Sequence, residues 1–199
     1  MPLDIAQAVC DEAHKLGLRT SAHIESTEGV EVGLKAGVDT IEHGAPLTDD
    51  LLKLFKKNGL GNVSSLTCTL SPALPFAVLS PEKTHSTHVQ KVNGRVVYEG
   101  VATATRQALA NGIPVGLGTD SACPFVTHYD MWREVVYFQR HTGVTPEFAL
   151  HTATLKNAQL LGVANETGSI ETGKSADFIV LDVNPLDDLC ALRNVEQVY

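Results

Sequence analysis

Three residues with metal-binding side chains stand at the ends of three stretches that have the composition of buried strands. His23 ends "LRTSAH", His43 ends "VDTIEH" and Asp120 ends "IPVGLGTD". Two imidazole nitrogens and one carboxylate oxygen form a donor set that suits Zn²⁺ and related divalent ions. Such an ion lowers the pKa of its bound water to about 7, and a nearby carboxylate can carry a proton to a leaving nitrogen. The pattern therefore predicts metal-dependent hydrolysis of a carbon–nitrogen bond.

Each of these residues has a plainer explanation when it is taken alone. A single histidine on an apolar strand is more often a hydrogen-bonded core residue than a metal ligand. Asp120 begins "DSACP", a sequence that is typical of a turn. Their joint occurrence at three strand ends favours a site. Glu25 and His128 follow two of these ends closely enough to contact a substrate, although a surface position explains them equally well.

The elements between these residues predict how the three ends are brought together. Apolar residues at helical spacing predict helices over 4–16, 28–36, 48–59, 98–111, 129–141 and 145–161, which alternate with strands over 18–23, 38–43, 60–66 and 113–120. Such alternation implies parallel strands, because each return to the same sheet edge needs a crossover helix. Both an open doubly wound sheet and an α/β barrel fit, and four units amount to half of a barrel.

Three segments depart from this alternation. Residues 67–93 hold three prolines and are predicted to be irregular, as a functional lid or a partly ordered excursion. Gly116 and Gly118 are expected to leave room under Asp120 for an ion or a substrate. Beyond Leu161, a glycine-turned hairpin and the apolar strands "DFIVLD" and "VEQVY" predict part of a small β-domain.

Composition excludes several classes of partner. A formal net charge of −8 argues against nucleic-acid and anionic-membrane surfaces, which need clustered basic residues. The four cysteines form no C-x-x-C pair, so reduced thiols in a cytoplasmic protein are expected. No apolar run reaches the roughly 18 residues of a membrane span, and the first residues do not resemble a signal peptide. Small molecules or other protein chains are the expected partners.

Four segments in order carry a resemblance to a known family: "SAHIESTEGVEVGLKAGVDTIEHG", "GLGTDS", "ATLKNAQLLG" and "GSIETGKSADFIVLDVNPL". They resemble the second half of the amidohydrolase superfamily, closest to its imidazolonepropionase and Xaa-Pro dipeptidase-like branch. The resemblance implies an α/β fold in which residues 1–161 supply strands five to eight of a (β/α)8 TIM-type barrel. Residues 162–199 would supply part of a β-sandwich domain.

The same resemblance implies roles for the site residues. His23 matches the metal histidine of the fifth barrel strand and His43 the histidine of the sixth, which contacts substrate instead of metal in members with one ion. Asp120 matches the aspartate of the eighth strand, which binds metal and activates water. One or two divalent ions, Zn²⁺ first among them, and a small amide or peptide-like substrate are therefore expected.

The family's H-x-H pair on the first barrel strand and its lysine on the fourth have no counterpart in this chain. We expect the native polypeptide to continue upstream of Met1 with an H-x-H motif, and we expect this chain alone to be inactive. A second hypothesis is a non-catalytic half-barrel that associates with itself or a partner chain through its open sheet edges. A homo-oligomer is the expected assembly. A doubly wound binding domain is a third, without a visible sequence fingerprint.

Overall fold

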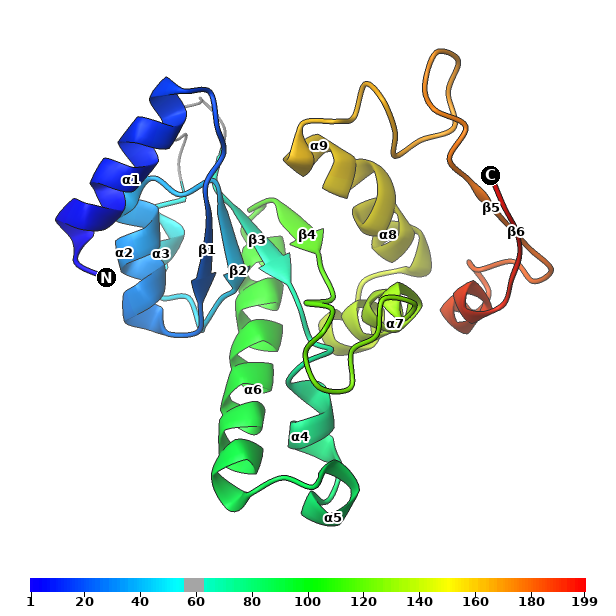
Figure 1. Ribbon diagram of the computed structural model, residues 1–199, viewed down its shortest axis with the longest axis horizontal. Coiled ribbons are helices and arrows are strands. Elements are labelled where there is room, and N and C mark those ends of the chain that lie inside the picture. Colours follow the sequence, from blue (N-terminus) through cyan, green and yellow to red (C-terminus); the bar gives the residue numbers. More distant parts are fainter. Residues whose placement is uncertain (56–62) are drawn as a thin grey trace. The chain divides into compact units, whose positions relative to one another are not determined.

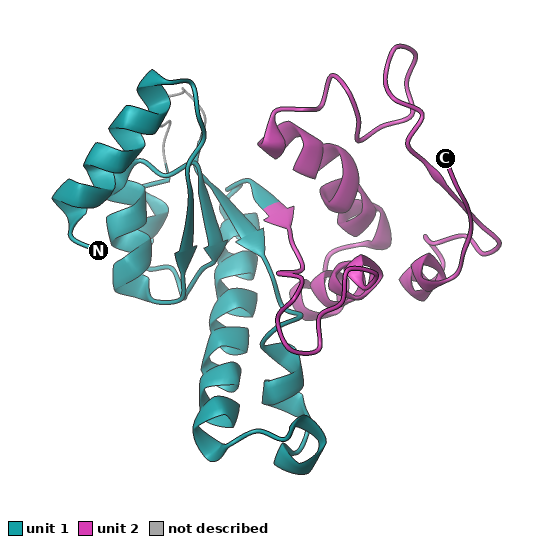
Figure 2. Cartoon of the chain, viewed as in Figure 1, with its two compact units in different colours: residues 1–115 teal, residues 116–199 magenta. Residues whose placement is uncertain are grey.

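The computed structural model of the chain describes residues 1–55 and 63–199, which form two compact units, 1–115 and 116–199 (Figure 2). Unit 1 contains α1 (Leu3–Lys15), β1 (Ser21–Ile24), α2 (Thr27–Ala36), β2 (Thr40–His43), α3 (Asp49–Leu52), β3 (Ser65–Cys68), α4 (Leu74–Val78), α5 (Pro81–Thr84) and α6 (His88–Ala110). β4 (Val115–Leu117) begins at the last residue of this unit. Residues 1–161 and 162–199 remain the expected division into barrel and sandwich parts.

The sheet has the strand order β1-β2-β3-β4 (Figure 1). β1 pairs with β2 and β2 with β3, both in parallel, as the alternation of strands and helices predicts. In this register Ile24 lies opposite His43 and His23 opposite Glu42. The carboxyl ends of β1 and β2 therefore meet at the same edge of the sheet.

The core of unit 1 forms between this sheet and its helices. Ile41 on β2, Leu66 on β3 and Val30 on α2 are fully buried. α2 packs against both β1 and α1, and the three elements lie side by side in Figure 1. The apolar spacing of α2 explains this, because Val30, Leu34 and the small Gly33 fall on one helix face. The helix begins at the Ser26 cap and ends at Gly37, which has a left-handed φ of 89°.

The prediction of an irregular segment over residues 67–93 is wrong for most of its length. β3 extends to Cys68, α4 and α5 follow, and α6 begins at His88 instead of Tyr98. Pro75 and Pro81 occupy the first turns of α4 and α5, where a missing N–H costs nothing. A capping box between Thr87 and Gln90 starts α6. The prolines thus mark helix starts.

The predicted helix 48–59 and strand 60–66 extend into residues 56–62, which lie outside the described residues. Within the described part, Thr48 caps α3 as expected, and the strand runs over Ser65–Cys68, later than predicted.

Unit 2 contains α7 (Met131–Thr142), α8 (Pro146–His151), the π-helical turn η1 (Thr152–Lys156), α9 (Asn157–Leu161), β5 (Ile179–Leu181), the 3-10 helix η2 (Leu189–Arg193) and β6 (Val195–Val198). β5 and β6 pair antiparallel, and the rings of Phe178 and Tyr199 stack at their ends with centroids 4.5 Å apart. The guanidinium of Arg193 lies 5.9 Å from the Trp132 ring centroid, which connects η2 to α7. The expected hairpin before β5 forms turns without strands.

None of the helices in residues 1–55 and 63–199 combines the length and the apolar character that crossing a membrane requires.

Candidate active site

Two of the three predicted metal ligands lie together at the carboxyl ends of neighbouring strands. His23 is the third residue of β1 and His43 the last of β2. Their ring centroids are 4.7 Å apart, with the rings edge to face at 77°. His43 is 7% exposed, whereas His23 is open to solvent. The pairing of two short parallel strands thus produces the convergence that the sequence predicts.

A tight turn fixes the position of His43. Its φ is 69° and that of Gly44 is 85°, so two successive residues have left-handed backbone. For a histidine this conformation costs on the order of 1–3 kcal/mol and persists only where the surroundings hold it. The N–H of Gly44 donates to the Ile24 carbonyl oxygen at 2.8 Å, and a Cβ at Gly44 would lie 2.5 Å from Leu66 Cδ1. The turn therefore requires glycine and places the imidazole firmly at the sheet edge.

Glu25 joins the two histidines. One ligand atom from each of His23, Glu25 and His43 lies within 4.8 Å of those of the other two. The sequence suggests Glu25 only as a substrate contact, but alternation along an extended chain puts residues i and i+2 on one side and could have grouped it with His23. Two imidazoles and a carboxylate are the donor chemistry of zinc sites, so the residues present fit a divalent ion.

The opposite end of the same strands carries a second polar cluster, in which the carboxylate is buried and hydrogen-bonded within the protein. Asp39 precedes β2, and its Oδ2 accepts hydrogen bonds from the Thr20 N–H at 2.7 Å, the Thr20 hydroxyl at 3.0 Å and His14 Nε2 at 2.9 Å. The Asp39 side chain is 1% exposed. Burial alone would raise the pKa of this carboxyl, but the hydrogen bonds from Thr20 and His14 outweigh it and lower the pKa. This cluster ties α1 to the starts of both strands.

Asp120, the third predicted ligand, lies in unit 2, three residues beyond the end of β4. Its φ of 54° is left-handed, and its Oδ2 accepts a hydrogen bond from Cys123 Sγ at 3.1 Å. This bond to Asp120, followed by burial and the negative charge of Asp120, raises the pKa of the Cys123 thiol to about 11. Cys123 therefore stays protonated and donates. The meeting of Asp120 with His23 and His43 stays a prediction.

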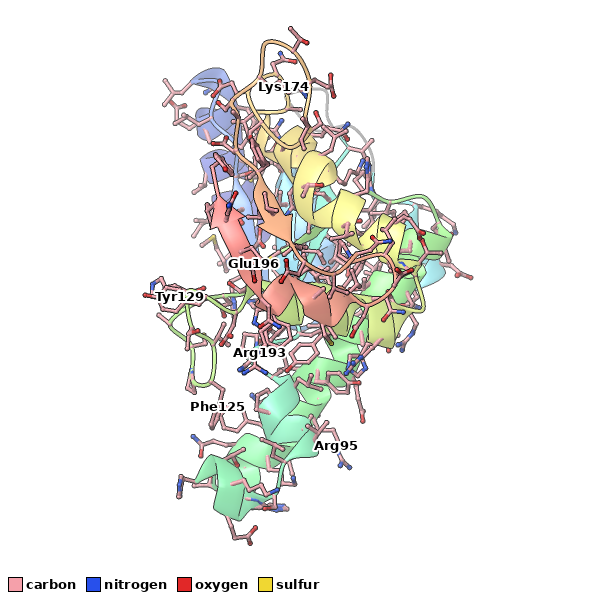
Figure 3. All side chains as sticks on the ribbon, turned by 90° about the vertical axis from the view of Figure 1, so that its right-hand side faces the viewer. Arg95, Phe125, Tyr129, Lys174, Arg193 and Glu196 are labelled. Carbon is pink, nitrogen blue, oxygen red and sulfur yellow. The ribbon has the colours of Figure 1, made fainter. Side chains whose placement is uncertain are left out.

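The loop between β4 and α7 carries Asp120 and the expected substrate contact His128. The loop is organised by its own backbone: the Ala122 N–H donates to the Val126 carbonyl oxygen at 3.2 Å, and Val126 is its buried anchor. His128 is exposed, and its contact with a substrate stays a prediction. Phe125 and Tyr129, labelled in Figure 3, are 44% and 89% exposed on the same loop.

The space expected beside Gly116 is filled by the protein itself. A Cβ at Gly116 would lie 2.9 Å from Asn157 Oδ1 and 3.1 Å from Leu160 Cδ1. The Asn157 side chain accepts from the Leu117 N–H and donates to its carbonyl oxygen, both at 2.9 Å. Gly116 therefore makes room for an amide that holds the end of β4, and the expectation of an ion or substrate there is wrong for this glycine.

Comparisons with known proteins agree with the resemblance seen in the sequence. The profile of the amidohydrolase family matches residues 2–199. An uncharacterized protein of Mycobacterium tuberculosis is 32% identical over 183 residues, which cover 92% of this chain and 46% of that protein. The ochratoxinase of Aspergillus niger is 27% identical over 193 residues, covering 96% of this chain and 38% of the enzyme.

Solved structures of related hydrolases are also similar to this chain. A provisionally assigned prolidase of Bifidobacterium longum is 45% identical, with a TM-score of 0.94, over all of this chain and 49% of that one. A Xaa-Pro dipeptidase with methionine bound in its active site is 29% identical, with a TM-score of 0.84, over all of this chain and 47% of that one. The chain thus spans about half the length of the relatives it matches. Together with the parallel sheet, these similarities fit a TIM-barrel-type α/β fold.

Proposed function

This chain belongs to the amidohydrolase family, and from that premise we propose that it supplies part of the active site of a metal-dependent hydrolase of carbon–nitrogen bonds. The observation that carries the proposal is the meeting of His23 and His43, with ring centroids 4.7 Å apart, at the carboxyl ends of two parallel strands. In barrel enzymes the catalytic residues stand at this end of the strands. An amide, a cyclic amide or a dipeptide-like molecule is the proposed substrate.

In this proposal His23, His43 and Asp120 hold one or two divalent ions, with Zn²⁺ preferred by the nitrogen and oxygen donors. When bound, the ion supplies Lewis-acid chemistry and makes water acidic enough to deprotonate near neutral pH. The Asp120 carboxylate accepts the proton of the attacking water and delivers it to the leaving nitrogen. The Cys123 thiol holds one oxygen of Asp120 in place, and His43, Glu25 and His128 contact the substrate.

We also propose that β1 to β4 correspond to strands five to eight of a (β/α)8 barrel and that residues 162–199 belong to a β-sandwich. The share of the relatives that this chain covers, about half, supports the first part. The antiparallel pair of β5 and β6 supports the second. We further propose a cytoplasmic enzyme, which the spacing of the four cysteines favours, and a homo-oligomer, which the open sheet edges favour. This chain alone is expected to be inactive.

The experiment that tests the function is the substitution Asp120→Asn in the protein as its host produces it. The amide cannot accept the proton, so kcat should fall on the order of 10³-fold. Hydrolysis is measured first on dipeptides that end in proline and then on N-acyl amino acids. The dipeptides are chosen because the structure at 45% identity is provisionally assigned as a prolidase and the one at 29% identity is a Xaa-Pro dipeptidase. Asp187→Asn, at an exposed aspartate, is the matched control. Undiminished turnover by Asp120→Asn, with an unchanged circular dichroism spectrum, would contradict the proposal.

A second candidate function is a non-catalytic half-barrel that associates with a copy of itself. A groove of about 660 Å³ runs beside β1, lined by consecutive residues 20–26 together with side chains of α1 and α2. β1 is an edge strand of the four-stranded sheet, and its residues line this groove. A stable monomer of this chain in sedimentation velocity would count against this second candidate.

A further inference from the structure

The cluster of His23, Glu25 and His43 lies wholly within unit 1 and contains one residue that the expected ligand set lacks. Its three ligand atoms lie within 4.8 Å of one another. Zn–N and Zn–O bonds are about 2.0–2.2 Å long, so two ligands on opposite sides of one ion are separated by at most about 4.4 Å, and tetrahedral ligands by less. Binding of one ion by all three atoms therefore requires the exposed His23 or Glu25 side chain to rotate inward.

The burial of the three residues is suited to a site with one fixed ligand and two adjustable ones. His43 is buried and held by the left-handed turn at Gly44, so it provides a fixed donor. His23 and Glu25 are exposed and can adjust their rotamers without disturbing the core.

Hydrogen bonding distinguishes Glu25 from Glu31 and Glu42. Glu42 accepts from the Ser21 and Thr40 hydroxyls, both at 2.7 Å, and Glu31 is paired with Lys35. Within residues 1–55 and 63–199, no hydrogen bond or ion pair engages the Glu25 carboxylate. It therefore stands beside two imidazoles with its oxygens available.

We propose that Glu25 binds a divalent transition-metal ion together with His23 and His43, so that unit 1 retains the ion without the help of Asp120. The inference shares its two histidines with the proposed function and adds a ligand to it. The two-nitrogen, one-oxygen donor set selects Zn²⁺ and Co²⁺ over Mg²⁺ and Ca²⁺, which prefer oxygen alone. Because a carboxylate has two oxygens, one can bind the ion while the other remains free for a substrate.

The test is a titration of the untagged 199-residue chain with Co²⁺, followed by its visible absorption, and a competition with Zn²⁺ measured by calorimetry. One ion per chain is expected. Glu25→Gln keeps the shape of the side chain but removes its charge, and it should raise the Kd at least about tenfold, as should His23→Ala. Glu28→Gln, three residues further along and also exposed, is the matched control and should change the Kd less than about twofold.

The outcomes separate this inference from the proposed function. Asp120→Asn should still bind one ion per chain. Unchanged affinity in Glu25→Gln, loss of the ion in Asp120→Asn alone, or no binding to the parent chain at millimolar Co²⁺ would each overturn the inference. Retained turnover by Asp120→Asn would overturn the proposed function and leave the role of Glu25 standing. Circular dichroism of every variant verifies that its fold is intact.

Discussion

The two ends of the β1–β2 pair use similar residues for opposite purposes. At the amino end, the carboxylate of Asp39 is buried and accepts hydrogen bonds from Thr20 and His14. At the carboxyl end, the carboxylate of Glu25 is exposed beside His23 and His43, and no partner for it is found in the part of the chain that the structure describes. A polar group satisfied within the protein contributes to stability, whereas one left available can bind a ligand. Histidine and carboxylate together thus do not identify a site; their hydrogen bonding does.

The largest effect that would test this comparison is expected from Asp39→Ala. The substitution removes three hydrogen bonds and leaves the partly buried Thr20 N–H and the His14 ring without their acceptor. Loss of one partner of a buried pair costs about 3 kcal/mol or more of unfolding free energy. Urea denaturation of the chain measures it. Asp11→Ala on the exposed side of α1 should cost less than about 0.5 kcal/mol, and equal losses for both variants would remove the distinction between the two ends.

Gly44→Ala tests whether the carboxyl end is held in place by the turn after His43. Its φ of 85° is unfavourable for alanine, and the added Cβ would lie 2.5 Å from Leu66 Cδ1. We expect a loss of about 2 kcal/mol or more, from backbone strain and overpacking together. Gly17→Ala is the control, because Gly17 has a φ of 71° but nothing within 4 Å of an added Cβ. It should cost about 1 kcal/mol, from strain alone. Equal losses would mean that the close approach to Leu66 has no consequence.

Acid should weaken the amino end in a defined range of pH. The pKa of Asp39 is lowered from its ordinary value of 3.8, so the folded state favours the ionised carboxylate. The stability that this gives is fully present above the unfolded value and is lost as the pH falls through the lower, folded value. The difference in unfolding free energy between the parent chain and Asp39→Asn should therefore be constant above about pH 5 and shrink below about pH 4. A difference that stays constant to pH 2 would contradict this assignment.

The smallest effect on stability is expected from His23→Ala at the carboxyl end. The ring is exposed and its neighbour in the structure is the His43 ring, so unfolding free energy should change by less than about 0.5 kcal/mol. The same variant should lose affinity for Co²⁺, so the two measurements together separate the ligand-binding role from the structural one. A loss of stability as large as that of Asp39→Ala would show that both ends serve the fold.

The sequence predicts the meeting of His23 and His43 because it depends only on local rules. Alternating burial defines each strand end, and parallel pairing of neighbouring strands places the ends side by side. The space at Gly116 could not be predicted in this way, because it is occupied by Asn157, forty residues away. The prolines of residues 67–93 favour an irregular segment, although Pro75 and Pro81 each lie in the first turn of a short helix. Long-range packing and the position of a proline within its helix are not visible in local periodicity.

The π-helical turn over Thr152–Lys156 has a consequence for the evolution of this chain. Such a turn contains one more residue than an α-helical turn would need over the same path. Because a residue advances an α-helix by about 100°, removing one residue from this turn would rotate α9 and swing the Asn157 amide away from the Leu117 peptide group that it clasps. Single-residue deletions should consequently be much less acceptable here than equally conservative substitutions. The π-helical turn thus determines the rotation of α9 about its axis, and with it the position of the Asn157 side chain at the end of β4.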